Sequence, residues 1–559
     1  MANGLLISYS GYPYTPSSLC PDNGLAGLAA VLQLSGHAVR ILDYGTVSTM
    51  ARLYPEPLSR RAGPLMAALA SSAGRPDEEL RRRLVELDRD LETHQASELA
   101  VISEEISRQV SEIGAAFVGF KLWNGDGFLG TIAIARRLRE LHPGLRLIAG
   151  GPHATWFRAL IHELTDVFDA IAVGEAEDKI GELADRAAAG RDFSGIPGVT
   201  CGASEHVEPT SAVDLARVPA GLYDTDTYPA MAGNDKLKLV IIDESRGCPY
   251  GCAFCAHPVE SGRRLRLRPP ELVVQDIEAL VREHRIRAFR FAGSSTPGSL
   301  MRDVAAGIID RGLDVRYCSF AHFASSDPAH FELLRRSGLH AMFFGLECGC
   351  PELLKRATGK PIRLDRIGDT VQAAKNAGIV AVCSMIVPMP FETEQTMQES
   401  LELLKRLAPD YVPVSFPGLL PGTPWFTQAE EYGFEVDKDE YLRQNLGYKF
   451  KMLFPPEFWE PLPYRLNGRG FAQFTRDTRR FIGMLEQAGI VTGLTDDHAL
   501  MAELSGIDAR ELRDLARLWC ATGDAASMQG FVESFNQAAC VPLPGDGESG
   551  RSSGAGGAS

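Results

Sequence analysis

The stretch RGCPYGCAFCAHP, from Arg246 to Pro258, places Cys248, Cys252 and Cys255 within eight residues. Three residues separate the first two cysteines, and two residues separate the second from the third. The chain has 11 cysteines among 559 residues, and its first residues lack the basic start and the cleavage site of a signal peptide. We therefore expect a cytoplasmic protein whose thiols are reduced and in part bind metal, rather than a protein with disulfides.

Three closely spaced thiols fit an iron–sulfur cluster better than a zinc ion. A structural zinc site usually needs four ligands in two close pairs, and no second pair lies near these cysteines. Three thiolates can bind three irons of a four-iron cluster and leave the fourth iron open to another ligand. A chance grouping or a zinc knuckle is the alternative interpretation.

The cysteines follow the first strand of a repeated strand–helix pattern. Six candidate strands are KLVIIDES, AFRFAG, VRYCSF, AMFFGLE, VAVCSMIVP and YVPVSF. This pattern predicts a partial (β/α)6 barrel of the TIM type over residues 236–424, with its active site at the carboxyl ends of the strands. Residues 425–540 predict a mostly helical domain that closes the barrel mouth, with core packing for Phe471, Phe474 and Phe481. The Gly/Ser-rich residues 541–559 predict a disordered tail.

The first part of the chain predicts an α/β domain of its own. Residues 1–200 carry five strand-like runs between helical stretches, which are GLLISY, AVRILDY, AAFVGFKLW, LRLIAGG and DAIAVGE. They predict a doubly wound, Rossmann-like sheet, and such sheets bind ligands at the carboxyl ends of their strands. Residues 46–114 form a helical insertion to which the sequence assigns no role, and residues 201–235 form a linker.

Composition limits the possible partners. The formal net charge of −15 argues against nucleic acid, because phosphate binding favours a basic surface. No apolar run is long enough to span a bilayer, so no membrane partner is expected. The basic strip GRRLRLR contains four arginines that are either solvated or bind a small carboxylate or phosphate, namely Arg263, Arg264, Arg266 and Arg268.

Around its cysteines the chain resembles the radical S-adenosylmethionine (SAM) superfamily, whose signature is Cys-x3-Cys-x2-Cys with an aromatic residue before the last cysteine. Phe254 fills the aromatic position. The resemblance implies a 4Fe–4S cluster bound by Cys248, Cys252 and Cys255, with the amino and carboxylate groups of SAM on its open iron. It also implies further SAM contacts in the segments FAGSSTP, GLECG and SMIVPMPFET, namely Gly293, Ser294, Ser295, Glu347 and Ser384.

The segments AGGPHAT and VGEAED resemble the cobalamin-binding domain that precedes many radical SAM barrels. The resemblance implies cobalamin contacts at Trp123, Asn124, Gly150, Gly151, Pro152, His153, Gly174 and Glu175. Two adjacent glycines let a flat macrocycle approach the backbone, whereas a plain turn with a helix-capping His153 is the alternative. The domain lacks the segment Asp-x-His-x-x-Gly, and His37 is expected only to close a helix before a strand. The cobalt of a bound cobalamin is therefore expected to have no His ligand on its lower face.

Together the two resemblances imply a cobalamin-dependent radical SAM methyltransferase of class B. Such an enzyme moves a methyl group from SAM, via methylcobalamin, to an unactivated or heteroaromatic carbon. The expected substrate is a small natural-product (antibiotic) intermediate, free or tethered to a carrier, and the expected electron donor is a reductase, a flavodoxin or a ferredoxin. Tyr317, His322 and His257 are candidate acid, base or positioning groups, and a structural role is the alternative for each.

Three other functions compete with this one. A cobalamin-dependent radical SAM cyclase or ring-rearranging enzyme would share both cofactors, and a cobalamin or iron–sulfur carrier would bind them without catalysis. A methylthiotransferase is disfavoured because the N-terminal 200 residues contain only Cys20, too few thiols for a second cluster. The sequence leaves open whether methyl transfer is radical or polar.

Overall fold

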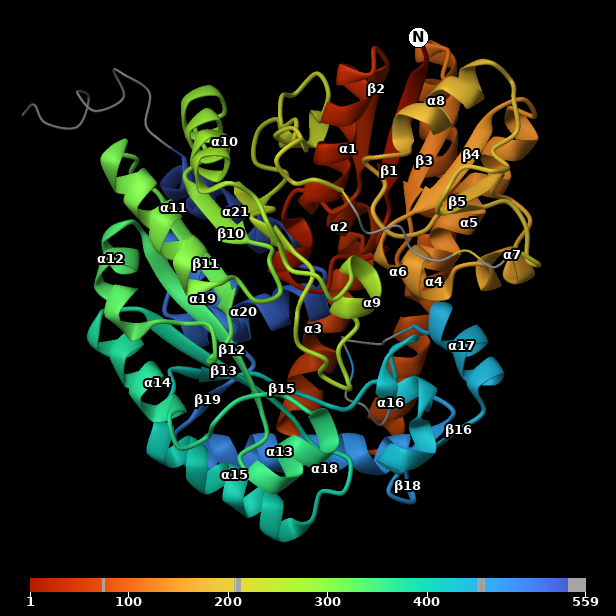
Figure 1. Cartoon of the computed structure of the whole chain (residues 1–559). Helices are drawn as coiled ribbons and strands as arrows, with labels where there is room; N and C mark the ends of the chain where they lie inside the picture. The colour runs from red at the N-terminus through yellow and green to blue at the C-terminus, as the bar shows by residue number, and fades with distance from the viewer. Residues whose placement is uncertain (73–75, 206, 208–212, 450–453, 455–457, 541–559) are drawn as a thin grey trace, which may run out of the picture.

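The computed structural model describes residues 1–559 except 73–75, 206, 208–212, 450–453, 455–457 and 541–559. The predicted tail, residues 541–559, lies outside the described residues. Figure 1 shows a largely parallel N-terminal sheet beside a second, curved sheet, with helices around both. Within the described ranges, no helix combines the length and apolar character needed to cross a membrane.

The N-terminal sheet has the strand order β2-β1-β3-β4-β5-β6. Its strands are β1 Asn3–Ser8, β2 Ala38–Asp43, β3 Phe117–Lys121, β4 Arg146–Gly150, β5 Ala170–Ala172 and β6 Val199–Thr200. The five predicted strands are present and parallel, and β6 is an antiparallel edge strand that the pattern did not predict. Along β1, Leu6 packs in the cluster that contains α1 (Asn23–Leu34), whereas Leu5 packs on the other face with α5 (Asp126–Leu141). Helices therefore cover both faces, as in a doubly wound fold.

The curved sheet is the predicted barrel. Its parallel strand order is β19-β14-β13-β12-β11-β10-β7, so β7 and β19 are edges and the barrel is open. Its strands are β7 Leu239–Ile242, β10 Ala288–Phe291, β11 Arg316–Ala321, β12 Leu339–Glu347, β13 Val380–Ile386, β14 Tyr411–Val412, β15 Val414–Ser415 and β19 Val491–Thr492. The sixth predicted strand is divided into β14 and β15, because Pro413 between them has no N–H to donate. The strand β19 comes from the C-terminal region and was not predicted.

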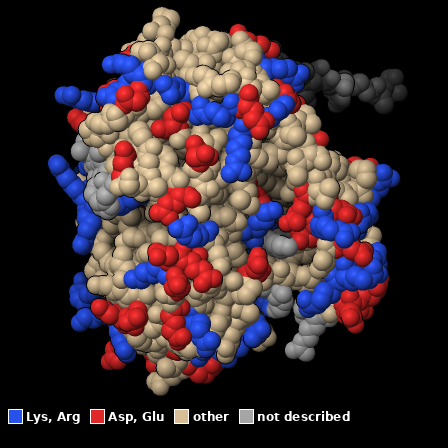
Figure 2. All heavy atoms as spheres, turned by 90° about the vertical axis from the view of Figure 1, so that its right-hand side faces the viewer, with Lys and Arg blue, Asp and Glu red and all other residues tan. Residues whose placement is uncertain are grey.

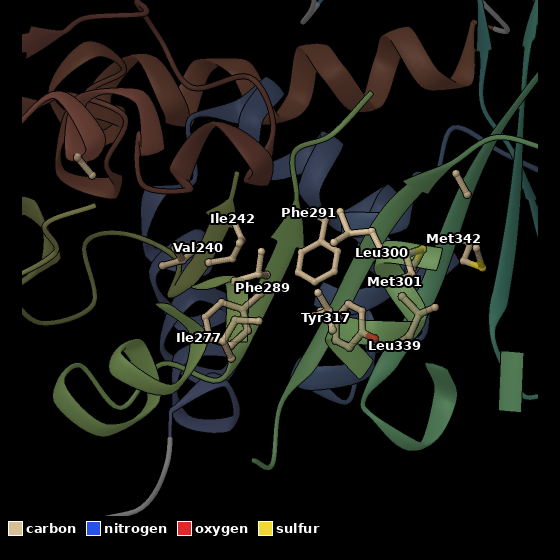
Figure 3. Packing of buried hydrophobic residues seen from close by; sticks show 14 of the residues in the cluster. Val240, Ile242, Ile277, Phe289, Phe291, Leu300, Met301, Tyr317, Leu339 and Met342 are labelled. Atoms are coloured by element: carbon tan, nitrogen blue, oxygen red, sulfur yellow. The ribbon is translucent and has the colours of Figure 1, made fainter. Parts of the chain in front are cut away.

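Alternating side chains give the barrel strands an outer and an inner face. On the outer face, Phe289 and Phe291 of β10 pack in one buried cluster with α10 (Pro270–Glu283) and α11 (Gly298–Asp310), as Figure 3 shows. Arg290, the residue between them, points to the inner face. There its guanidinium binds Asp496, with Nη2 2.7 Å from Oδ1, and lies over the ring of Phe320.

The C-terminal helices occupy both ends of the barrel. The helices α19 (Asp496–Ser505), α20 (Ala509–Thr522) and α21 (Ala525–Ala539) share a buried cluster with the amino-terminal ends of the strands. The helix α18 (Phe471–Gln487) lies at the carboxyl end, where Phe471, Phe474 and Phe481 are buried as expected. The expectation that the whole region closes the barrel mouth is therefore wrong for α19–α21, which close the opposite end.

The insertion that the sequence left without a role packs on these same helices. It consists of α2 Val47–Leu53, α3 Glu56–Ser71 and α4 Glu78–Ile113. The helix α3 contacts α20, and α2 contacts α21. The insertion thus fixes the N-terminal domain to the closed, amino-terminal end of the barrel.

The buried ion pair in the barrel interior predicts a large loss of stability on substitution. Asp496 is fully buried, so Arg290→Met leaves a carboxylate in the core without its cation. We expect the free energy of unfolding in urea to fall by about 3–5 kcal/mol. Arg302→Met, at a half-exposed arginine, should change it by less than about 0.5 kcal/mol. A loss below about 1 kcal/mol for Arg290→Met would contradict this account of the core.

Candidate functional site

The three cysteines lie in a loop that a short β-ribbon closes. The strands β8 (Ser245–Arg246) and β9 (Arg266–Leu267) pair antiparallel on either side of the loop and of α9 (His257–Ser261). Gly247 begins the loop with φ of +79°, and a Cβ at this position would lie 2.2 Å from the carbonyl oxygen of Arg264. Only glycine fits there. The sequence RGC therefore sets the sharp turn that leads into Cys248.

The donor set fits an iron–sulfur cluster. All three thiols are free and line one cavity, and Cys248 is only 8% exposed. Burial raises the pKa of Cys252 to about 11 and that of Cys255 to about 12, so binding must supply the free energy that keeps them as thiolates. Among the described residues no three His, Cys, Asp or Glu side chains are grouped to hold a single metal ion. A cluster instead binds each thiolate at a different iron.

A cavity of about 770 Å³ opens at the carboxyl ends of the barrel strands. It contains residues from the cysteine loop, from the ends of four strands and from α18. The sequence-predicted residues that it brings together are Cys248, Cys252, Phe254, Cys255, His257, Ser294, His322, Glu347 and Ser384. Gly293 and Ser295 are not among its lining residues, and Ser295 is buried.

Tyr317 is a correction to the sequence prediction. It is the second residue of β11, at the amino-terminal end of the strand, whereas the cavity lies at the carboxyl end. Its side chain is 1% exposed, and its hydroxyl shares a hydrogen bond of 2.7 Å with the hydroxyl of Ser337. Tyr317 therefore packs in the core, and the strand places Ala321 and His322 at the cavity instead.

Lys360 is a cavity residue that sequence reasoning missed. It follows α13 (Pro351–Thr358), and its Nζ lies 2.7 Å from Oε1 of Glu347. Both side chains are more than nine-tenths buried. Glu347 has a φ of +67°, a conformation that non-glycine residues adopt at a cost and that is common at functional sites. The sequence pattern marked Glu347 but could not show which cation neutralises it.

Sequence analysis also missed Glu244, which supports the predicted SAM-binding turn through hydrogen bonds. It is fully buried, accepts a hydrogen bond of 3.0 Å from the backbone N–H of Gly293, and accepts one of 2.6 Å from the hydroxyl of Thr296. A Cβ on Gly293 would lie 2.1 Å from its carboxylate oxygen. The glycine is therefore required so that Glu244 can approach the turn and present Ser294 to the cavity.

The predicted cobalamin contacts lie along the carboxyl rim of the N-terminal sheet. Trp123 donates to the hydroxyl of Ser8 at 3.1 Å, which joins the ends of β3 and β1 at the point where the strand order reverses. Gly151 has a φ of +99° and, with Pro152, begins α6 (Pro152–Phe157). Gly174 has a φ of +79°, and Asn124 lies between β3 and α5.

His153 makes this rim suitable for a large ligand. Its ring packs edge-on against Trp156 at 4.7 Å and lies 6.0 Å from Trp123. Its Nδ1 is buried without a hydrogen-bond partner among the described residues, and burial lowers its pKa to about 4. A buried polar atom of this kind fits a rim that a further molecule covers. His37 lies elsewhere, where its Nδ1 accepts from the N–H of Ala2 between α1 and β2.

Glu175 contacts the protein instead of pointing freely at the rim. Its Oε2 accepts from Arg266 of the β8–β9 ribbon at 2.7 Å. Glu177 accepts from Arg246 of the same ribbon at 2.6 Å, and α6 contacts α9. Figure 1 shows α6 and α9 side by side. The rim of the first domain therefore borders the cysteine loop of the second.

The remaining predicted groups differ in exposure. The His257 side chain is about half exposed, and its Nδ1 lies 3.8 Å from Glu260. Arg266 and Arg268 of the basic strip are engaged with Glu175 and Asp276, whereas Arg263 and Arg264 are exposed. On the face that Figure 2 shows, acidic and basic side chains are interspersed rather than gathered in one basic surface.

Glu244 predicts a specific pH dependence of stability. Burial raises its pKa to about 7 from an ordinary value near 4.5, so the folded state holds this proton more tightly than the unfolded state does. Its contribution to stability is complete below the ordinary value and is lost progressively as the pH rises from that value to about 7. Glu244→Gln should reduce the loss of unfolding free energy between pH 5 and 7 by about 2 kcal/mol in urea titrations. The same loss in Glu244→Gln and in the exposed Glu435→Gln would contradict the assignment.

Comparison with known proteins agrees with this geometry. Residues 244–404 match the family model described as the radical SAM superfamily. An uncharacterized methyltransferase of Pyrococcus horikoshii is 27% identical over 52% of this chain and 64% of its own. The cobalamin-dependent radical SAM methyltransferase TokK of Streptomyces tokunonensis is 25% identical over 61% of this chain and 52% of its own. The chain thus matches roughly half to two thirds of the length of these relatives.

The architecture is shared with a solved structure along nearly the whole chain. The radical SAM methyltransferase TsrM of Kitasatospora setae, solved with cobalamin and a [4Fe–4S] cluster, superimposes with a TM-score of 0.61. The match covers 94% of this chain and all of TsrM. At 18% identity, this likeness establishes the fold alone. The chain therefore contains a radical SAM domain, and it has the fold and the domain order of TsrM.

Proposed function

We propose that this chain is a cobalamin-dependent radical SAM C-methyltransferase that acts on an unactivated or heteroaromatic carbon of a small natural-product intermediate. The observation that carries the proposal is the cavity in which the three free thiols meet Ser294, Glu347 and Ser384. This cavity adjoins the rim of the Rossmann-like sheet, because Arg246 and Arg266 connect the cysteine loop to that rim. The similarity to TokK, a cobalamin-dependent radical SAM methyltransferase, supports the choice of reaction.

The residues of the chain have distinct tasks in this proposal. The three cysteines bind the cluster, and the turn at Ser294, the Glu347–Lys360 pair and Ser384 bind SAM along the strand ends. Trp123, Gly151 and His153 face cobalamin from the first domain. When bound, the cluster supplies the electron that cleaves SAM, and cobalamin supplies a cobalt that carries the methyl group.

The remaining space of the cavity is available to the methyl acceptor. Its lining also contains Phe416, which follows β15, Trp459, and Ile482 and Arg479 of α18. Aromatic and aliphatic side chains exclude water from a reactive intermediate. A flat, mostly apolar acceptor fits such a lining, either free or delivered on a carrier.

An electron donor and a reducing compartment also belong to the proposal. An external reductase, flavodoxin or ferredoxin supplies the electron to the cluster. The 11 cysteines are all free, which is typical of the reducing conditions of the cytoplasm.

Product analysis tests the reaction. The protein is reconstituted anaerobically with iron, sulfide and hydroxocobalamin, then incubated with SAM and a low-potential reductant. We expect 5′-deoxyadenosine and S-adenosylhomocysteine by mass spectrometry. The triple variant Cys248→Ala, Cys252→Ala, Cys255→Ala should form no 5′-deoxyadenosine. As a matched control, Cys201→Ala, Cys520→Ala, Cys540→Ala removes three thiols outside the cavity and should retain both products.

The other outcomes identify the competing functions. S-adenosylhomocysteine alone indicates polar transfer to an electron-rich ring. Formation of 5′-deoxyadenosine alone contradicts methyl transfer and favours a cyclase or a ring-rearranging enzyme. If neither product forms although both cofactors are bound, the result favours a carrier.

Cobalamin binding tests the role of the N-terminal rim separately. Gly151 needs its positive φ, and a Cβ would lie 3.2 Å from Cγ of Lys121, so Gly151→Ala must displace the rim. We expect cobalamin retained through gel filtration, measured by its visible absorbance, to fall several-fold. Gly144→Ala, at a glycine with open space around its Cβ position, should retain the wild-type amount. Equal cobalamin retention in both variants would show that Gly151 is not part of the cofactor site.

A further inference from the structure

His322 lies where β11 ends at the cavity, and its surroundings hold its ring in one orientation. His322 is only 6% exposed, and it lines the cavity together with Ser294. Its ring stacks on Tyr250, with 4.0 Å between centroids and 17° between planes. Tyr250 lies between the first two cluster cysteines, so the cysteine loop itself positions His322.

The hydrogen bonds of His322 determine which nitrogen carries the proton. Its Nδ1 accepts a hydrogen bond of 3.1 Å from the backbone N–H of Ala324. A ring nitrogen that accepts has no proton, so the proton of the neutral ring is on Nε2. The backbone carbonyl of His322 accepts from the N–H groups of Ser325 and Ser326, which fixes the turn.

The Nε2–H group is a donor without an acceptor. Nε2 is buried and has no hydrogen-bond partner among the described residues. Buried donors in native proteins are nearly always paired, so an unpaired one that lines a cavity points to a ligand atom. Burial, followed by the charge of Lys360, lowers the pKa of His322 to about 3 and keeps the ring a neutral donor.

The position of the donor selects the part of the ligand that it meets. Lys360 acts electrostatically on His322 and also on Cys252 and Cys255, so these groups surround the same part of the cavity. In the proposed function, the amino-acid end of SAM is the part that reaches the cluster, and its carboxylate is the acceptor there. Lys360, paired with Glu347, offsets negative charge in this region.

We propose that His322 is a SAM-binding residue whose Nε2–H donates a hydrogen bond to the carboxylate of SAM. This inference rests on the proposed function and replaces the acid or base role that the sequence suggested for His322. The stacking of Tyr250 couples the donor to the cysteine loop, so that carboxylate and cluster are positioned by one segment.

Binding measurements with two ligands test the proposal. The dissociation constants of SAM and of decarboxylated SAM are measured by equilibrium dialysis with the cluster-loaded, cobalamin-loaded protein. His322→Phe keeps a ring against Tyr250 and has no N–H donor. His322→Asn can accept from Ala324 through Oδ1, but its shorter side chain has no N–H at the position of Nε2. We expect both variants to bind SAM about 10- to 100-fold more weakly. Decarboxylated SAM should lose little affinity, so the preference for SAM over it should fall by a similar factor.

A matched control separates a local effect from a general one. His340 is also buried, and its Nδ1 has no hydrogen-bond partner among the described residues. It lies near the amino-terminal end of β12, with its Nδ1 3.9 Å from Glu503. His340→Phe should leave both dissociation constants unchanged. Iron content and thermal unfolding of each variant establish that the cluster and the fold are intact.

The outcomes distinguish this inference from the proposed function. If the wild-type protein does not bind SAM, the proposed function fails. If the wild type binds SAM and the His322 variants bind it equally well, the inference is wrong while the function stands. If both ligands weaken equally, His322 does not contact the carboxylate, and the proposal is likewise overturned.

Discussion

The ion pairs between the β8–β9 ribbon and the loop after β5 are the interaction on which the site depends. Arg246 immediately precedes the turn into Cys248, and it binds Glu177 of the N-terminal domain. Arg266, on the paired strand, binds Glu175. All four side chains are at least 85% buried, so loss of one partner leaves a buried charge that is costly to keep. The same residues thus close the cysteine loop and place it against the rim of the first domain.

The amino-terminal end of the barrel is filled, and this places the site at the carboxyl end. The helices α19–α21 fill the amino-terminal end, and Arg290 with Asp496 holds them inside the strands. The insertion α2–α4 packs on them from the N-terminal domain. What remains open is the carboxyl end, which is where parallel barrels hold their functional groups. A segment that the sequence could not interpret therefore serves to orient two domains around one cavity.

The features that depend on a local sequence pattern were predicted well. The strands were predicted because apolar runs between helical stretches are local signals, and the cysteines because their spacing is itself the signal. Lys360, Glu244 and the roles of Arg246 and Arg266 escaped prediction, because each depends on a partner that is distant in the chain. Tyr317 and His322 were treated alike, although they lie at opposite ends of β11. A single sequence fixes the ends of a strand only to within a few residues. That uncertainty is enough to confuse a core residue at one end of the strand with a cavity residue at the other.

The central claim is that three thiolates hold an iron–sulfur cluster with one iron open to SAM. Electron paramagnetic resonance of the anaerobically reconstituted and reduced protein, with and without SAM, tests it most directly. The account predicts four irons per chain and a cluster signal that changes when SAM is added. Tightly bound zinc in place of iron, or a cluster signal that SAM leaves unchanged, would contradict it.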